Sequence, residues 1–257
     1  MIIGKVFRVR VLVLGGTAQA RELAAELHGR EGCRVVSSLA GRVSRPALPE
    51  GEVRIGGFGG AGGLADYLRD EAIEVLIDAT HPFAQVMSGQ AAQAAEATGV
   101  RLIALRRPGW SPETGDRWIH VADIAEAARH AADLPDDECV FVTTGRGGLE
   151  QYAGDERHDY LIRTVDPPTE TLPPRHVVVL DRGPYTVDGE TALMERHGVS
   201  VLVTKNSGGS STEAKLVAAR RRGIPVVMIE PPAPRADVES VGTVAQAVGL
   251  LGFSGTE

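Results

Sequence analysis

The densest run of polar residues is Thr204-Lys-Asn-Ser-Gly-Gly-Ser-Ser-Thr-Glu213, which follows an apolar stretch typical of a buried strand. Lys205 can hold a phosphate or a carboxylate as a point charge, and Asn206 and Ser207 are expected beside it in a cofactor site. Glu213 can act as a general acid or base. The spacing Ser-x-x-Glu also matches a capping box, so a purely structural role for this glutamate stays open.

A second candidate site lies at Gly15-Gly16-Thr17, between the first apolar run and the first amphipathic run. Backbone N–H groups at the start of a helix suit a phosphate, and Thr17 could add a hydroxyl donor. The alternative is a tight turn with Thr17 as helix cap. A formal G-x-G-x-x-G also occurs at Gly57–Gly62, but it lies among six glycines in eight residues, GGFGGAGG. We interpret that run as a flexible loop, in which single Gly→Ala changes should be tolerated far better than bulky side chains at Gly15 or Gly16.

Gly41 and Arg42 follow a further apolar run, where a residue can reach the adenosine ribose of a dinucleotide. An arginine there suits the 2′-phosphate of NADP. Because no acid ends that run, the sequence favours NADPH over NADH. The alternative is an ordinary solvated loop arginine.

His81, in Asp78-Ala-Thr-His-Pro-Phe-Ala84, could donate a proton or contact an anionic ligand. The alternative is a turn histidine held before a proline. No second His or Cys stands at metal-ligand spacing, so no metal is expected. The sequence also lacks the P-loop and the G-x-S-x-G elbow, which excludes P-loop kinases and leaves covalent hydrolases without support.

Composition narrows the class of protein further. The chain has 257 residues, a net charge of −7 and a pI of about 5.6, whereas nucleic-acid-binding domains are normally basic. No apolar run approaches the roughly 18 residues of a membrane span. The two cysteines lie in strand-like runs, as in a reduced cytoplasmic protein. We expect no nucleic-acid or membrane partner, and a monomer or a small homo-oligomer.

Short apolar runs alternate with Ala-rich helical stretches, which is typical of parallel sheets covered on both faces. Glu74–Pro108 and Ser200–Pro231 share one plan of strand, polar turn, helix, Gly-Val or Gly-Ile, and strand. Two α/β domains are therefore predicted, residues 1–110 and 111–257, joined near the turn-rich segment from Pro108 to Trp118. Strands are expected at Val9–Leu14, Cys33–Leu39, Glu52–Ile55, Val75–Ala79, Arg101–Leu105, Cys139–Thr143, Tyr160–Thr164, Val177–Leu180, Val199–Thr204 and Pro225–Ile229.

The polar clusters at these strand ends occur in a distinctive order. The ordered set resembles the precorrin-6A reductase family of cobalamin biosynthesis over roughly residues 9–250. The resemblance implies two Rossmann-like domains with the active site in the cleft between them. It also implies reduction of one double bond of the precorrin macrocycle by hydride from NAD(P)H plus a proton. The motifs are Gly15-Gly-Thr17, Ser38-Leu-Ala-Gly-Arg42, Asp78-Ala-Thr-His-Pro-Phe-Ala84, Thr144-Gly-Arg146, Gly183-Pro-Tyr185 and Thr204-Lys-Asn-Ser-Gly-Gly-x-x-Thr-Glu-Ala-Lys215.

With this resemblance, Glu213, Lys205 and His81 become the candidate catalytic residues. The candidate substrate-binding residues are His81, Phe83, Arg146 and Tyr185. A tetrapyrrole substrate carries many carboxylates, which an acidic protein must hold with locally concentrated positive charge. A non-catalytic Rossmann-type protein that senses NADP(H) or holds a tetrapyrrole is the alternative. The candidate arginines for the carboxylates are Arg106, Arg107, Arg146, Arg163 and Arg182.

Overall fold

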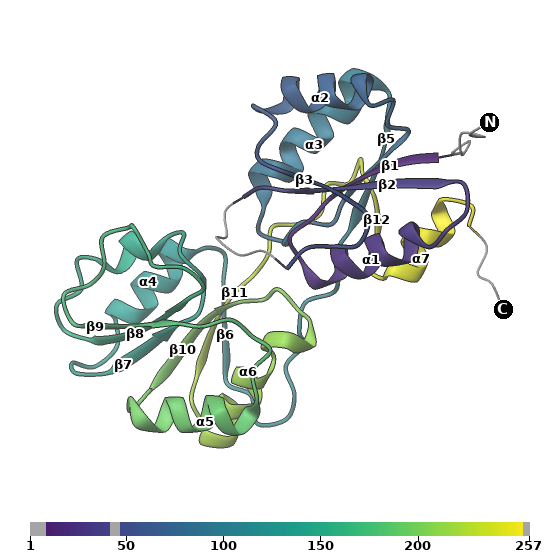
Figure 1. Cartoon of the computed structure of the whole chain (residues 1–257). Helices are drawn as coiled ribbons and strands as arrows, with labels where there is room; N and C mark the ends of the chain where they lie inside the picture. The colour runs from purple at the N-terminus through teal and green to yellow at the C-terminus, as the bar shows by residue number, and fades with distance from the viewer. Residues whose placement is uncertain (1–8, 42–46, 254–257) are drawn as a thin grey trace, which may run out of the picture. The chain divides into compact units, whose positions relative to one another are not determined.

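The chain folds into two compact units in the computed structural model, which describes residues 9–41 and 47–253 (Figure 1). Unit 1 contains the residues up to Arg107 and those from Pro232 onward, and unit 2 spans Pro108–Pro231. Each unit has a six-stranded sheet in which neighbouring strands are parallel. The predicted fold class, two α/β units with Rossmann-like parallel sheets, is confirmed.

Unit 1 has the strand order β12-β5-β4-β1-β2-β3. This is the doubly wound order 3-2-1-4-5-6, with β12 as the sixth strand, and the order reverses between β1 and β4. Its strands are β1 (Val9–Leu14), β2 (Cys33–Leu39), β3 (Glu52–Ile55), β4 (Val75–Asp78), β5 (Arg101–Leu105) and β12 (Glu239–Val241). Its helices are α1 (Ala18–His28), α2 (Ala61–Asp70), α3 (Gln85–Thr98) and α7 (Val244–Leu250).

The central strand of unit 1 is apolar on both faces. Val11 and Val13 pack in the cluster that includes α1 and α7. Leu12 and Leu14 point the other way, into the cluster with α2 and α3. Successive strand residues face opposite sides of a sheet, so a continuous apolar run is what a sheet covered by helices on both faces requires.

Unit 2 has the order β6-β11-β10-β7-β8-β9, which reverses between β7 and β10. This matches unit 1, except that the strand in the sixth place comes first in its unit. The strands are β6 (Trp118–Val121), β7 (Cys139–Val142), β8 (Asp159–Thr164), β9 (His176–Leu180), β10 (Val201–Lys205) and β11 (Val226–Ile229). The helices are α4 (Ile124–Ala132), α5 (Val187–Arg196) and α6 (Ala214–Arg222), with 3₁₀ turns η1 (Leu149–Tyr152) and η2 (Ser210–Thr212).

The repeated sequence segments occupy equivalent places in the two sheets. One forms β4-α3-β5 and the other β10-α6-β11, the fourth and fifth strands of each order. Both helices end at a left-handed glycine, Gly99 with φ 72° and Gly223 with φ 69°. Glycine adopts this conformation without the steric cost of a Cβ, so the shared Gly-Val and Gly-Ile pairs mark the turns into β5 and β11.

The structure corrects the predicted C-terminal domain, residues 111–257. β12 lies parallel to β5, with Glu239 opposite Ile103. Val244 and Val248 of α7 are buried in the same cluster as Leu23 of α1. The segment from Pro232 onward therefore completes the sheet and the core of unit 1.

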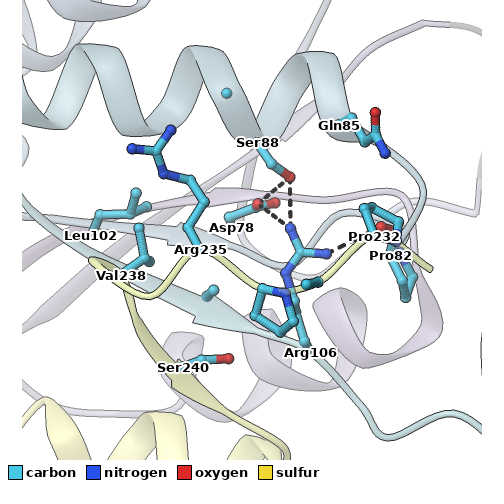
Figure 2. A pocket seen from close by; sticks show the side chains of 14 residues that line it. Asp78, Pro82, Gln85, Ser88, Leu102, Arg106, Pro232, Arg235, Val238 and Ser240 are labelled. Atoms are coloured by element: carbon cyan, nitrogen blue, oxygen red, sulfur yellow. Dashed lines mark hydrogen bonds and ion pairs between the residues drawn. The ribbon is translucent and has the colours of Figure 1, made fainter.

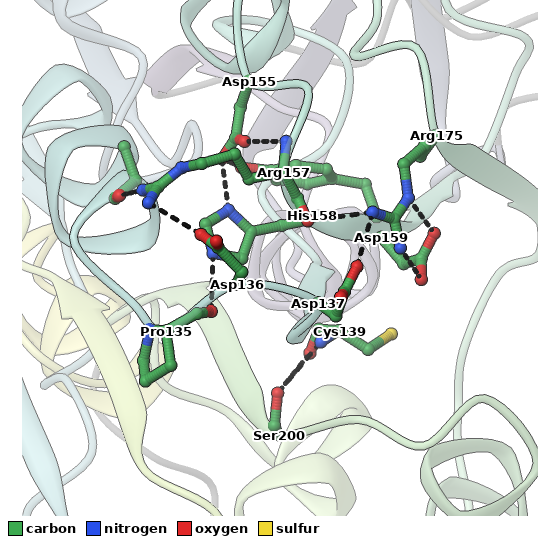
Figure 3. A network of polar contacts seen from close by, with 12 residues as sticks. Pro135, Asp136, Asp137, Cys139, Asp155, Arg157, His158, Asp159, Arg175 and Ser200 are labelled. Carbon is green, nitrogen blue, oxygen red and sulfur yellow. Dashed lines mark hydrogen bonds and ion pairs between the residues drawn. The ribbon is translucent and has the colours of Figure 1, made fainter.

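A polar network lies at the amino ends of the unit 2 strands (Figure 3). Arg175 forms ion pairs with Asp137 (2.8 Å) and Asp159 (2.7 Å). The buried His158 contacts Asp155 through Nδ1 (2.7 Å) and the Pro135 carbonyl oxygen through Nε2 (2.9 Å). These contacts fix the edge of the sheet opposite to the carboxyl ends, where the candidate site residues lie.

Candidate functional site

The Gly15-Gly16-Thr17 turn of unit 1 follows β1, beside the point where the strand order reverses, which is the usual ligand position in open parallel sheets. Gly15 follows β1, and its N–H donates to the Ser38 carbonyl at the end of β2. Thr17 caps α1, because its Oγ1 accepts from the N–H of Ala20 at 3.0 Å. The same hydroxyl donates to the Ala79 carbonyl oxygen at 2.9 Å and so ties the ends of β1 and β4 together. The Thr17 hydroxyl hydrogen is therefore used inside the protein.

Gly16 leaves open space over the start of α1. Its φ is +111°, and a Cβ at this position would meet nothing within 4 Å. The first N–H groups of a helix lack partners within the helix, and the helix dipole favours an anion beside them. The start of α1 can therefore receive a phosphate through backbone N–H groups.

The second glycine run is more ordered than the sequence suggested. The Arg54 guanidinium donates to the carbonyl oxygens of Gly56 and Gly57 and lies 3.7 Å from the Phe58 ring centroid. α2 already begins at Ala61, and a Cβ on Gly63 would collide with the Phe58 carbonyl oxygen. The expected tolerance of this run to single Gly→Ala changes therefore does not extend to Gly63.

Gly41 follows β2 and has a left-handed φ of +71°. Arg42, the predicted 2′-phosphate contact, lies outside the described residues. Its assignment therefore stays a prediction.

The end of β4 carries a polar cluster beside a cavity of about 200 Å³ (Figure 2). The buried Asp78 carboxylate accepts from Thr80 Oγ1 (2.6 Å) and Ser88 Oγ (2.6 Å). Arg106 donates to Ser88 Oγ at 2.9 Å and to the Pro82 carbonyl oxygen at 3.2 Å, and it pairs with Asp78 at 3.5 Å. Protein groups therefore hold the Arg106 guanidinium beside the cavity that it lines, and its role as a contact for substrate carboxylates stays a prediction.

His81 and Phe83 lie together in the turn between β4 and α3. Their ring centroids are 5.7 Å apart, and His81 Nδ1 accepts a 3.4 Å hydrogen bond from the N–H of Phe83. His81 is exposed and Phe83 is half-buried. The turn therefore presents an imidazole and an aromatic ring from one short segment.

In unit 2, Lys205 lies where the strand order reverses. Its amine donates to the Thr144 carbonyl oxygen at 2.8 Å, which joins the ends of β10 and β7. Burial lowers the pKa of this amine below its ordinary value. Arg146 follows Thr144 and is half-buried. The structure thus brings Lys205 and the Thr144-Gly-Arg146 motif to one point of the sheet edge.

The neighbours of Lys205 differ in how their side chains are used. Asn206 is buried, and its side-chain oxygen accepts from the Trp110 N–H at 2.7 Å. Its amide nitrogen donates to the Trp110 carbonyl oxygen and to the Glu230 carboxylate. The Asn206 side chain therefore holds the protein together at this point. Ser207 is also buried.

Glu213 is exposed and forms no capping hydrogen bond in the described part of the chain. The 3₁₀ turn η2 precedes α6, and Glu213 itself has helical dihedrals, φ −71° and ψ −29°. A capping residue normally has extended dihedrals. The Ser-x-x-Glu capping box is therefore not formed, and the carboxylate points to solvent at the start of α6.

Arg163 and Glu190 form a buried ion pair between β8 and α5. The Tyr185 ring covers the Arg163 guanidinium, 3.8 Å from the ring centroid, and burial raises the pKa of the Tyr185 hydroxyl. The Tyr185 N–H donates to the Ser211 carbonyl oxygen, which joins the Gly183-Pro-Tyr185 motif to the polar loop before α6. Arg163 is thus committed to Glu190, which corrects its prediction as a substrate contact.

Sequence reasoning missed three features: the Arg163–Glu190 pair, the cavity beside Arg106 and the burial of Lys215. A buried position within the Ala-rich stretch of α6 was the available signal for Lys215.

Within residues 9–41 and 47–253, no helix has the length and apolarity to cross a membrane. The same residues place no group of three or more His, Cys, Asp and Glu side chains to bind a metal.

Comparisons with known proteins cover nearly the whole chain. A precorrin-6A reductase from Rhodococcus erythropolis is 51% identical over 95% of this chain and 97% of its own length. A cobalt-precorrin-6A reductase from Priestia megaterium is 28% identical over 86% of this chain and 90% of its own. A solved structure, CobK precorrin-6A reductase, superposes with a TM-score of 0.86 at 44% identity, covering 95% of this chain and 96% of that one. Residues 10–251 match the family of precorrin-6x reductases CbiJ/CobK, and the chain belongs to that family.

Proposed function

We propose that this chain is an NADPH-dependent precorrin-6A reductase that reduces one double bond of the macrocycle in cobalamin biosynthesis. The observation that carries the proposal is the family match over residues 10–251, which spans the candidate residues of both units. Identity is 51% to a relative named for precorrin-6A and 28% to one named for cobalt-precorrin-6A. This difference supports a metal-free macrocycle as the substrate.

The residues of unit 1 fit a dinucleotide. A phosphate needs close approach to backbone N–H groups, and the space at Gly16 is one that a Cβ would enter. When bound, NADPH supplies the hydride. The start of α1 would hold its pyrophosphate, and Arg42 its 2′-phosphate.

The side chains of unit 2 fit the remaining tasks of the reaction. Lys205, at the end of β10, would hold an anionic group of cofactor or substrate as a point charge. Glu213 would deliver the proton that the neighbouring ring carbon needs, directly or through water. Arg146 follows β7, and Arg182 lies exposed just after β9. These positions support both arginines, with Tyr185, as contacts for the substrate and its carboxylates, and His81 and Phe83 as contacts from unit 1.

The test is turnover with the natural reactants. Purified protein is incubated with NADPH and precorrin-6A, and NADPH oxidation is followed together with the absorption spectrum of the macrocycle. We expect NADPH and precorrin-6A to be consumed in equal amounts, and turnover to be slower with NADH or with cobalt-precorrin-6A. Binding of NADPH or macrocycle without any oxidation would instead support a sensor or carrier protein.

Gly16→Val is expected to weaken NADPH binding at least about tenfold, a loss of ~1.4 kcal/mol. A valine side chain would occupy the space over the start of α1 and block phosphate approach. The matched control is Gly59→Val, because Gly59 also has a left-handed φ (+80°) and no neighbour within 4 Å of a Cβ. Titration of both variants should leave only the control near the wild-type Kd. An unchanged Kd for Gly16→Val would place the pyrophosphate elsewhere.

Arg42→Ala is expected to weaken NADPH binding much more than NADH binding. Only NADPH carries the 2′-phosphate, and a charge-assisted contact of this kind contributes about 1.5–3 kcal/mol. Kd values for both nucleotides, measured with wild type and variant, give the comparison. Equal weakening of both nucleotides would show that Arg42 supports its loop without reading the phosphate.

A further inference from the structure

A lysine that the proposed reaction does not use lies buried in unit 2. Lys215 is the second residue of α6 and is 4% exposed. Its amine lies 5.5 Å from the centroid of the Trp110 ring. It forms neither a hydrogen bond nor an ion pair with the residues that the structure describes. Lysine is almost never fully buried without a paired group, so this position requires an explanation.

The charges around Lys215 disfavour its ammonium form. Arg163 on β8 repels it, while Glu190 on α5 attracts it but is already paired with Arg163. The Tyr185 ring, from the turn before α5, covers the Arg163 guanidinium. Lys205 precedes the polar loop that leads to α6, and the exposed Glu213 ends it. Lys215 also lies in the first turn of α6, where the helix dipole is positive. Burial and Arg163 together lower the pKa of Lys215 to about 7.

The polar loop before α6 contacts the same cluster at both of its ends. Asn206 holds the backbone of Trp110, whose ring lies against the Lys215 amine. Ser211 accepts a hydrogen bond from Tyr185, whose ring covers Arg163. A charge bound on this loop therefore lies close to the groups that surround Lys215.

Unpartnered hydroxyls give independent support for a polar ligand at this edge. Thr144, Thr164 and Thr204 are each more than nine-tenths buried, and their Oγ1 atoms have no hydrogen-bond partner in the described residues. They lie at the carboxyl ends of β7, β8 and β10, which are neighbours in the sheet. Buried hydroxyls normally have a partner, so this edge is suited to receive further polar groups.

The choice of residue type points the same way. The chain has three lysines, Lys5, Lys205 and Lys215, among 27 lysine and arginine residues. Arginine keeps its proton in proteins, whereas a buried lysine gains and loses one readily. Two of the three lysines, Lys205 and Lys215, border the loop before α6, although arginine is by far the commoner cation of this chain.

We propose that the loop from Lys205 to Glu213 binds an anionic group, and that Lys215 takes up one proton from solvent when it does. The group is a phosphate of the dinucleotide or a carboxylate of the macrocycle, so the inference rests on the proposed function. A bound anion stabilises the ammonium form of Lys215, and by linkage the protonated amine strengthens anion binding. The free amine is charged below its pKa and neutral above it, so affinity falls as the pH rises through this value. Lys215 is thus a positioning residue for the ligand.

The small number of lysines allows a direct test on the wild-type chain. Protein labelled with ¹³C at the lysine side chains is titrated with acid and base and followed by NMR, and Lys5→Met and Lys205→Met assign two of the signals. We expect the Lys215 signal to titrate near pH 7. When a probe binds, the pKa of Lys215 should rise by at least about one unit, which corresponds to a tenfold effect on affinity. NADPH tests the phosphate, and a stable porphyrin with acetate and propionate arms tests the carboxylate.

Calorimetry supplies the second measurement. The heat of probe binding is measured at a pH above 7 in buffers of different ionisation enthalpy. The dependence of this heat on the buffer gives the number of protons taken up on binding. Wild type and the Lys5→Met control should take up more protons than Lys215→Met with the same probe. A Lys215 signal that titrates above about pH 9, or one that does not move while a probe binds, overturns the proposal and leaves the proposed function intact. Failure of both probes to bind contradicts the proposed function itself.

Discussion

Glu213→Gln is expected to lower the turnover of the folded enzyme by about 10²–10⁴, the typical contribution of a positioned general acid or base. Protonation of carbon is slow without such a donor, and glutamine has no proton to give. Glu213 is exposed at the start of α6 and caps nothing in the described structure. The substitution therefore leaves the fold untouched, and wild type and variant should melt at the same temperature.

The matched control for this variant is Glu156→Gln. Glu156 is also exposed in unit 2, but it precedes β8 and so lies at the opposite edge of the sheet. Turnover with saturating NADPH and precorrin-6A, measured for both variants, separates a chemical role from a general loss of negative charge. If Glu213→Gln turns over within a factor of a few of wild type, the proton comes from another group.

Strands buried on both faces could be predicted from the sequence because their apolar runs are unbroken. β2 was predicted at its observed bounds, Cys33–Leu39. β6 and β12 were missed: β12 has a single apolar residue, Val241, and β6 begins at Trp118, where the predicted turn-rich linker ends. The return of the C-terminal segment to unit 1 depends on the pairing of β12 with β5. No local pattern reveals a partner that lies so far away in the sequence.

The positions of the candidate site residues could also be predicted, because the carboxyl ends of parallel strands collect at one edge of a sheet. The hydrogen-bond and ion-pair partners of these side chains could not be predicted. Ser210 and Glu213 have the spacing of a capping box, yet the 3₁₀ turn η2 precedes the helix at that place. Arg163 is buried and paired, as a structural arginine is, only because Glu190 of another element packs against it. Such pairings are tertiary, so residue type and spacing alone do not distinguish them from ligand contacts.

Glu190→Gln is expected to destabilise unit 2 by about 3–5 kcal/mol, the usual cost of leaving a buried charge without its partner. Arg163 is 6% exposed and cannot reach solvent when the carboxylate is removed. Lys215 loses the attraction of the same carboxylate, which adds to the repulsion within the cluster. The free energy of unfolding should be measured by denaturant titration of tryptophan fluorescence. Both tryptophans of the chain, Trp110 and Trp118, lie in unit 2, so the signal reports this unit.

Two further variants separate the loss of a partner from the loss of an ion pair as such. Asp136→Asn removes the partner of Arg157 in a pair whose side chains are 50% and 70% exposed, and it should cost at most about 1 kcal/mol. Arg163→Met combined with Glu190→Leu removes both buried charges, and this double variant should recover most of the stability that Glu190→Gln loses, because apolar residues often replace a buried pair at little cost. If the double variant is as unstable as Glu190→Gln, the ion pair itself stabilises unit 2, and the unpaired guanidinium is not the cause of the loss.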